Sequence, residues 1–151
     1  MSKVATVFQT TGCDALYGDL LYVDQVDTDK VIRYWKSGPY KPSAFKWGWM
    51  PPHPTFFVKR ELYEKWGNFD LRLKTSADYE LMLRFIYKHK IKLEYIPSVL
   101  VKMRMGGVSN YSLSNRLKAN TEDKLAWALN DLHPFWFTLY LKPLQKIKQF
   151  I

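Results

Sequence analysis

Five prolines lie between residues 38 and 54, and they limit the fold more than any other feature of the chain. Proline fixes its own φ and has no backbone N–H, so helix interiors and central strands exclude it. The same segment carries Trp47, Trp49, Met50 and His53. A long loop with so many rings is more often functional than a simple connection. We therefore expect regular elements on both sides of a functional loop.

The part of the chain before this loop is rich in strand-forming residues. A short amphipathic helix is expected to end at Gly12. Ala15–Val23 then predicts a buried strand, and Val31–Trp35 predicts a second strand as its hairpin partner. Gly18 inside the first strand indicates a bulge or a close backbone approach.

The part after the loop carries mainly helix signals. Ser76 is a good N-cap for the helix that follows it, and Pro97 is expected to divide two strands. This order predicts a mixed α/β fold, with strands crowded early and helices late. The expected elements are a strand at Thr55–Val58, strands at Lys92–Ile96 and Val99–Met105, and helices at Arg60–Trp66, Ala77–His89, Leu113–Leu132 and Phe135–Ile151.

Charge and cysteine content indicate the kind of partner and the cellular compartment that are expected for this protein. The formal net charge of +9 fits an anionic partner, which could be nucleic acid, an anionic membrane surface or a phosphate-bearing substrate. The single cysteine, Cys13, excludes an intrachain disulfide and favours a reducing compartment. No apolar run could span a bilayer and no signal peptide is visible, so we expect a cytoplasmic protein. GxGxxG and Walker A patterns are absent, so the chain shows no nucleotide cradle.

Four stretches, in this order, carry a resemblance to a known family. Each one alone is weak, but the succession with its spacing is fairly specific. Together they resemble bacterial family 2 (GT-A type) glycosyltransferases that build surface polysaccharides. The stretches are Tyr17–Asp24 (YGDLLYVD), Trp47–Phe57 (WGWMPPHPTFF), Ser76–Arg84 (SADYELMLR) and Met103–Ser109 (MRMGGVS).

The resemblance implies a partial domain. We expect an α/β, partial GT-A (Rossmann-like) fold, a mixed sheet with helices, that lacks the N-terminal nucleotide-binding half. Residues 1–110 would form the C-terminal half of the catalytic domain, and residues 111–151 a C-terminal helical extension that could associate with a membrane.

The resemblance also implies an inverting transfer from a nucleotide-sugar donor to a lipid-linked or saccharide acceptor. The family uses a divalent cation, Mg²⁺ or Mn²⁺, whose ligands would lie outside this chain. Asp27 and Asp29 have the Asp-x-Asp spelling of a metal motif but are expected in a surface turn. The isolated chain is therefore expected to be inactive, and an inert fragment of such an enzyme is a further interpretation.

Asp78 is the candidate catalytic base. Inverting transfer needs a group that takes the proton from the acceptor hydroxyl, and the family places this base at the equivalent helix start. The sequence differs slightly from the commoner Glu-Asp pair. The alternative is an acid that only stabilises the first helical turn. Glu80 is the second choice, although it could instead face solvent or pair with Arg84.

Four further residues are candidates for substrate binding. His53 could aim its ring at an acceptor or a phosphate, and Trp49 could line a sugar platform while Trp47 packs inward, or the reverse. Asp19 could reach the acceptor and Arg104 could hold a diphosphate. The alternatives are a structural hydrogen bond for His53, core packing for both tryptophans, backbone bonding for Asp19 and a solvated strand end for Arg104.

Residues 135–151 combine aromatic, apolar and lysine residues and contain no acid. This is typical of an interfacial helix on an anionic membrane, which would make the protein peripheral at the inner face of the membrane. The alternative is a terminal helix docked on the core. A basic nucleic-acid-binding module is the alternative function, but the basic residues are spread out and show no recognised RNA-binding or zinc-finger pattern, so nucleic acid is not an expected partner.

Overall fold

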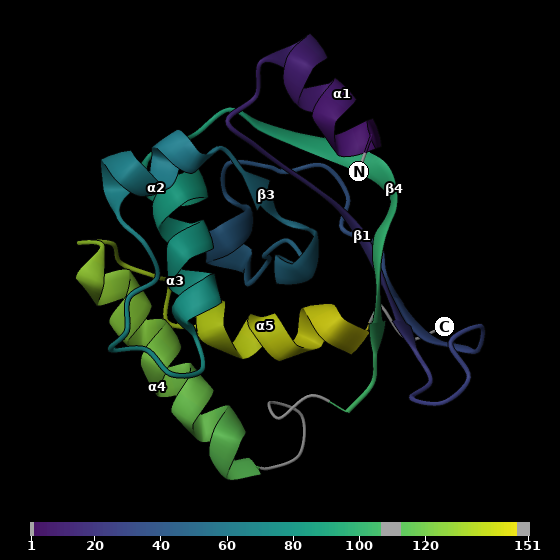
Figure 1. Ribbon diagram of the computed structural model, residues 1–151. Helices are drawn as coiled ribbons and strands as arrows, with labels where there is room; N and C mark the ends of the chain where they lie inside the picture. The colour runs from purple at the N-terminus through teal and green to yellow at the C-terminus, as the bar shows by residue number, and fades with distance from the viewer. Residues whose placement is uncertain (1, 107–112, 148–151) are drawn as a thin grey trace.

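Strand β1 (Ala15–Val23) is the centre of a four-stranded mixed sheet (Figure 1). The computed structural model describes residues 2–106 and 113–147. Strand β4 (Leu93–Arg104) runs parallel to β1 along its whole length. On the other side, β2 (Val31–Trp35) and the short β3 (Phe57–Val58) pair antiparallel with opposite ends of β1. The expected β1–β2 hairpin is confirmed with its predicted bounds.

The prediction that Pro97 divides two strands is wrong, because β4 continues through it. Gly18 of β1 pairs with Ile96 and the next residue, Asp19, pairs with Val99, so Pro97 and Ser98 form a bulge. A bulge residue is left unpaired in the hydrogen-bond ladder, so the N–H that proline lacks is not needed at this position. Of the two alternatives predicted for Gly18, the close backbone approach is confirmed, since a Cβ there would lie 2.9 Å from Ser98 O, whereas the bulge lies opposite Gly18 in β4.

The loop of residues 38–54 contains two short 3-10 helices, η1 (Ala44–Trp47) and η2 (His53–Thr55). The strand expected to begin at Thr55 begins instead at Phe57. The reason is local, because the backbone N–H of Thr55 donates to Pro52 O over 2.9 Å and so continues the turn.

Most helices lie close to their predicted bounds. Helix α3 (Ala77–Met82) continues as a π-helical segment, η3 (Leu83–Lys88), that ends one residue before the expected end. Helix α4 (Leu113–Leu129) ends three residues early, because Asp131 adopts a positive φ of 57°. The other helices are α1 (Ser2–Thr11), α2 (Arg60–Trp66), which ends at Gly67 as predicted, and α5 (Thr138–Ile147). Helix α5 begins three residues later than expected, because residues 136 and 137 form a turn in which the Thr138 N–H donates to Phe135 O, and its expected continuation to residue 151 lies outside the described residues.

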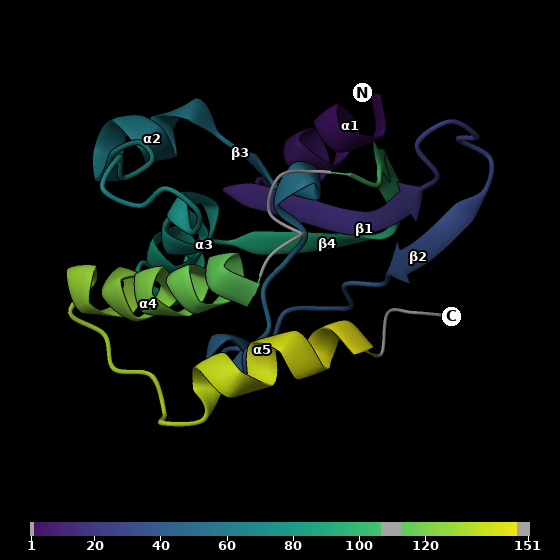
Figure 2. The same cartoon turned by 90° about the horizontal axis from the view of Figure 1, so that it is seen from below.

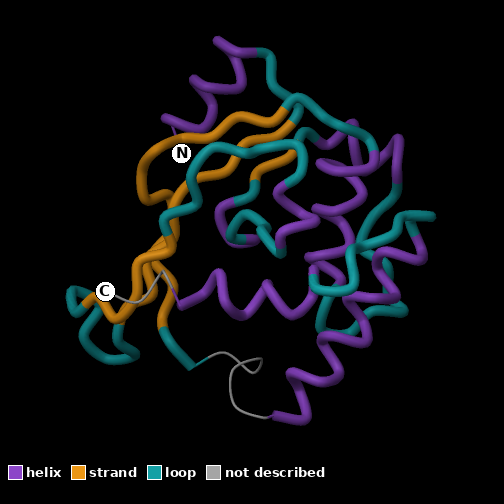
Figure 3. The backbone as a smooth tube through the Cα atoms, turned by 180° about the vertical axis from the view of Figure 1, so that it is seen from behind, coloured by secondary structure: helices purple, strands orange, loops and turns teal. Residues whose placement is uncertain are grey.

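The sheet separates two apolar clusters, with α1 on one face and α4 and α5 on the other (Figure 2). Seen from behind, the strands gather on one side and most helices on the other (Figure 3). Leu16 packs with Cys13 and Ile96 beneath α1. Its neighbour Ala15 belongs to the larger cluster, which includes Phe45, Tyr79, Phe85, Trp127 and Leu139.

Helices α4 and α5 therefore share the main core with α3, through Trp127 and Leu139. The boundary expected at residue 110 lies outside the described residues. Within the described residues, no strand pairs with the outer edge of β4, so the sheet is open there. None of the described helices combines the length and the apolar character that crossing a membrane requires.

Candidate functional site

Asp78 and His53 come together at the start of α3. Asp78 Oδ2 lies 3.7 Å from His53 Nδ1, and the two side chains are 35% and 44% exposed. The other carboxylate oxygen, Oδ1, accepts the backbone N–H of Tyr79 over 2.8 Å. The predicted position of Asp78 at a helix start, next to His53, is thus confirmed, whereas the cleft expected in front of the carboxylate stays a prediction. The carboxylate and the imidazole therefore face each other in a pair that is partly open to solvent.

The loop that carries His53 is tied to β1 at both ends. At its beginning, the Ser37 hydroxyl donates to Gly18 O over 2.8 Å. At its end, the Thr55 hydroxyl lies 2.9 Å from the same oxygen. The backbone oxygen of Gly18 in β1 therefore fixes both ends of the loop, and with them the position of the His53 ring.

The start of α3 is fixed by an acid from α4. Ser76 directly precedes the helix as predicted, but its hydroxyl makes no capping hydrogen bond. Instead, Glu122 Oε2 accepts the backbone N–H groups of Thr75 and Ser76 over 2.7 and 3.0 Å. Partial burial would raise the pKa of Glu122, but these hydrogen bonds outweigh it and lower the pKa below its usual range. A carboxylate from another helix thus does what the serine was expected to do.

A buried polar network supports Asp78 from behind. Tyr79 accepts a hydrogen bond from Trp127 Nε1 over 2.9 Å, and its ring lies under Lys142 Nζ at 3.6 Å. Lys142 Nζ also bonds Asp123 Oδ2 over 2.7 Å. Burial, and then the nearby Asp123 carboxylate, raises the pKa of Tyr79. Through Trp127 and Lys142, helices α4 and α5 thereby fix the position of Tyr79, which directly follows the candidate base Asp78.

Asp19 has a structural set of partners. Its buried carboxylate accepts the Tyr34 hydroxyl over 2.7 Å, the Tyr95 hydroxyl over 2.8 Å and the Ser37 N–H over 2.9 Å. The hydrogen bond from Tyr34 to Asp19 raises the pKa of Tyr34. Burial, and then the hydrogen bond from Tyr95 to Asp19, raises the pKa of Tyr95 to about 12. Only the Ser37 contact matches the backbone-bonding alternative, and the two tyrosine hydroxyls were not predicted; together the three contacts favour a structural role over contact with an acceptor.

The two loop tryptophans divide as one of the alternatives predicted. Trp49 points inward: its Nε1 donates to Ser37 O over 3.1 Å, and its ring packs edge-on against Tyr17 and Phe45. Trp47 is half exposed and lies against Phe137, with ring centroids 5.3 Å apart. Trp47 is therefore the tryptophan that a sugar could reach, whereas Trp49 supports the loop.

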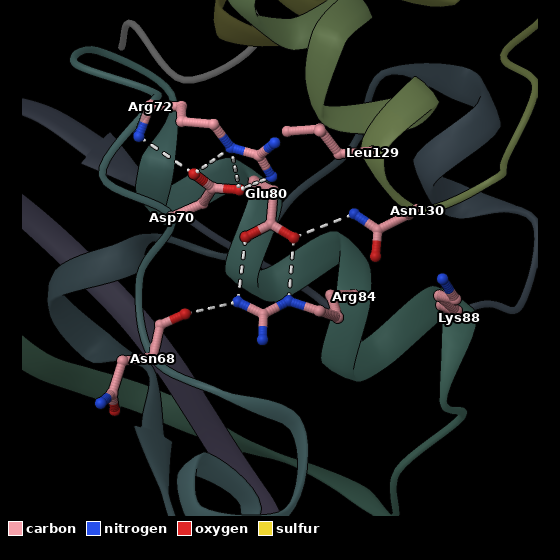
Figure 4. Close-up of a pocket in the computed structure, with 8 residues that line it drawn as sticks. All are labelled: Asn68, Asp70, Arg72, Glu80, Arg84, Lys88, Leu129 and Asn130. Carbon is pink, nitrogen blue, oxygen red and sulfur yellow. Dashed lines mark hydrogen bonds and ion pairs between the residues drawn. The ribbon is translucent and has the colours of Figure 1, made fainter.

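Glu80 lies in a surface pocket whose charges pair with one another (Figure 4). The predicted pair with Arg84 is confirmed at 2.8 Å, and Glu80 is buried rather than solvent-facing. Arg84 also donates to Asn68 O over 2.7 Å, and Asn130 Nδ2 donates to Glu80 Oε1 over 2.9 Å. The network binds the α2–α3 loop to α3 and the end of α4, which is a structural task.

Arg104 is exposed at the end of β4, opposite Val23 of β1. The end of β4 and α3 lie on opposite sides of α5 in Figure 1. The described structure therefore does not bring Arg104 to the Asp78–His53 pair. The rest of the glycine-containing stretch, Gly107–Ser109, lies outside the described residues.

The described residues do not fit a divalent cation. In residues 2–106 and 113–147, no three His, Cys, Asp or Glu side chains gather as metal ligands. Asp27 and Asp29 lie in the turn between β1 and β2, as expected. There, Asp27 Oδ1 accepts the N–H of Asp29, and Asp29 lies 3.8 Å from Lys102 Nζ.

Phe69 is a site residue that the sequence reasoning missed. Its ring lies edge-on to His53, with centroids 6.1 Å apart, and it is 39% exposed. It lies between the polar residues Asn68 and Asp70 in the segment after Gly67, which is the signal that could have drawn attention to it. Asp78, His53 and Phe69 thus place a carboxylate, an imidazole and an apolar ring on one accessible surface.

Comparisons with protein-family models, with curated proteins and with solved structures found no match to this chain.

Proposed function

We propose that the protein is the acceptor side of an inverting glycosyltransferase that uses a nucleotide-sugar donor, with Asp78 as the catalytic base. The observation that carries the proposal is the Asp78–His53 pair at 3.7 Å, with both side chains partly exposed. A partly exposed carboxylate with one oxygen bonded to the backbone and the other facing an imidazole is suited to take a proton from a hydroxyl.

The surroundings of Asp78 suit a saccharide. Phe69 offers an exposed apolar face next to His53, and sugar rings pack their C–H faces on such rings. His53 Nδ1 faces the carboxylate, so the ring can orient Asp78 or hold a neighbouring hydroxyl. The donor would be held by a Rossmann-like half outside these 151 residues, on the same or another polypeptide. The divalent cation of the resembling family would belong to that half.

A binding experiment tests the acceptor site without requiring turnover. Short oligosaccharides and lipid-linked saccharides are titrated into the purified chain while its amide and side-chain NMR signals are followed. We expect shifts confined to His53, Phe69, Asp78 and their neighbours, retained in Asp78→Asn and lost in Phe69→Ala. Leu71→Ala is the matched control, because Leu71 is exposed in the same loop.

Two outcomes of this titration count against the proposal. One is the absence of any shift with every saccharide. The other is strong, salt-dependent binding of single-stranded oligonucleotides across scattered lysines, which would instead support the nucleic-acid-binding alternative.

The catalytic role has its own test. In an enzyme assembled from this chain and a nucleotide-sugar site, Asp78→Asn should lower kcat by about 10²–10⁴ while donor binding stays near normal. The 151-residue chain alone should release no nucleoside diphosphate above an Asp78→Asn control. Unchanged turnover in the assembled variant would remove Asp78 as the base.

A further inference from the structure

An exposed aromatic patch lies where α5 begins. We define the aromatic patch as Trp47, Phe135, Trp136, Phe137 and Tyr140. Trp136 is 85% exposed and Tyr140 is 62% exposed. Phe137 is the centre, with ring centroids 5.3 Å from Trp47, 5.3 Å from Phe135 and 5.5 Å from Trp136. Exposed rings gathered in this way mark a surface that meets another phase or partner.

The aromatic patch is held in place by the core. The Thr138 hydroxyl donates to Lys46 O over 2.7 Å, which joins α5 to η1. Leu139 is buried in the main core. The backbone of Lys142 comes so close to Gly48 that a Cβ on the glycine would lie 2.6 Å from its nitrogen. The aromatic patch is therefore a fixed surface, formed by the docking of α5.

This docking changes the expectation for residues 135–151. The alternative of a helix docked on the core holds for α5, since Leu139 and Lys142 are engaged inside the molecule. The side chains of Leu139 and Lys142 are consequently not free to lie on a membrane. The exposed rings come instead from the first turn of α5, the segment before it and η1.

The charge around the aromatic patch has one sign. Neither residues 36–50 nor residues 132–151, which supply the patch, contain an aspartate or a glutamate. Lys46 Nζ lies 4.7 Å from the centroid of the Phe135 ring, and Lys41 is exposed just before η1. The neighbouring acid Asp131 already lies 3.5 Å from Lys88.

From this combination we infer that the aromatic patch binds the surface of an anionic membrane. Trp and Tyr settle at the headgroup level because their rings are apolar and their N–H and O–H groups remain hydrated. Lysines beside them are attracted by anionic headgroups. Single-stranded nucleic acid also combines stacking on rings with attraction to lysines, so binding of an oligonucleotide in preference to anionic vesicles would overturn the inference. This inference stands whether or not the chain takes part in sugar transfer.

The test is co-sedimentation with vesicles of phosphatidylcholine, alone and mixed with phosphatidylglycerol. Wild type should bind the anionic vesicles, and added salt should weaken the binding. Combining Trp136→Ser with Tyr140→Ser should reduce partitioning about tenfold or more. Lys41→Glu should weaken binding to the anionic vesicles while it leaves the rings intact. Leu71→Ser, which removes a 92% exposed apolar side chain outside the aromatic patch, should have no effect.

Several outcomes overturn the inference. Wild type that ignores anionic vesicles, or binds both vesicle types equally, removes it. Unchanged binding by the double variant, with its fold verified by circular dichroism, removes the role of the rings. A concentration-dependent dimer that the double substitution dissociates, without vesicle binding by wild type, would identify a second copy as the occupant.

Discussion

Asp19 is a buried carboxylate whose three partners come from two separate parts of the chain. The hydroxyls of Tyr34 and Tyr95 and the N–H of Ser37 all donate to it. Buried groups of this kind are worth most when every donor is satisfied. Asp19 therefore connects β1, β2 and β4 and fixes the start of the loop that carries His53.

The stability of an Asp19→Asn variant tests this role. The amide removes the charge and places an N–H₂ group among donors, so we expect a loss of about 1–3 kcal/mol in the free energy of unfolding. Urea unfolding followed by tryptophan fluorescence measures it. Asp29→Asn is the control, because Asp29 is exposed in a surface turn and should change stability by less than about 1 kcal/mol. Equal stability of Asp19→Asn and wild type would make Asp19 a possible acceptor ligand again.

The sequence could predict some of these residues and not others. Asp78 was placed correctly because a cap signal and a helical pattern are local in the chain. The burial of Asp19 could not be predicted, because Tyr34 and Tyr95 reach it from strands 15 and 76 residues away. Glu122, which fixes the start of α3, lies 46 residues from Ser76 and was missed for the same reason.

Among the elements, the bulge between β1 and β4 depends on Gly18. An added Cβ would lie 2.5 Å from Leu100 Cγ and 2.9 Å from Ser98 O. We expect Gly18→Ala to destabilise the protein by about 1–3 kcal/mol through overpacking. Chemical unfolding of Gly18→Ala, Leu100→Ala and the double variant measures the coupling. The double variant should lose less than the sum, since Leu100→Ala relieves the side-chain overlap but not the approach to Ser98 O. Full additivity would exclude the overlap with Leu100 as the cause.

The docking of α5 depends on a buried ion pair. Lys142 Nζ lies 2.7 Å from Asp123 Oδ2, with the two side chains 18% and 2% exposed. Asp123 Oδ1 has no hydrogen-bond partner among the described residues. Lys142→Met would leave a buried carboxylate without its cation and should cost about 3–5 kcal/mol of stability. Combining it with Asp123→Asn should recover part of that loss.

Thermal and urea unfolding of these variants measure how much the Lys142–Asp123 pair contributes to stability. Lys88→Met is the matched control, because its partner Asp131 is 93% exposed and the pair should contribute less than about 1 kcal/mol. If Lys142→Met proved as stable as Lys88→Met, the pair would not hold α5 on the core.

The bounds of an element could be predicted where the residues that begin and end it are close to it in the sequence. Strands β1 and β2 and helix α2 were predicted with their bounds, because Gly12, Asp24 and Gly67 end or begin them within the local sequence. The continuity of β4 through Pro97 was not, because the bulge that permits it requires Gly18 of another strand. The π-helical segment after Met82 likewise could not be predicted from the local sequence.

At the scale of the whole molecule, the two faces of the sheet carry cores of different size. Beneath α1, Cys13, Leu16 and Ile96 form a small cluster, which Val7 and Phe8 cover in part. The main core on the other face holds the buried residues of α3, η3, α4 and α5. A ten-residue helix is not stable by itself in water, so α1 depends on this limited packing. We infer that α1 opens more readily than the rest of the fold.

The single cysteine reports on that opening. Cys13 is fully buried beneath α1, so a thiol reagent can reach it only when α1 lifts or the whole protein unfolds. Phe8→Ala removes apolar packing from α1 alone and should raise the Cys13 labelling rate about 5–30-fold, the factor that corresponds to one or two kcal/mol. The same substitution should leave the protection of β1 and β4 amides in hydrogen exchange nearly unchanged. Leu81→Ala, in the main core, is the control: it should lower the protection of those amides and the global stability by about 2–5 kcal/mol. Should Phe8→Ala and Leu81→Ala instead change labelling and amide protection in the same proportion, α1 and the main core would unfold as one unit, and the separate opening of the α1 layer would be excluded.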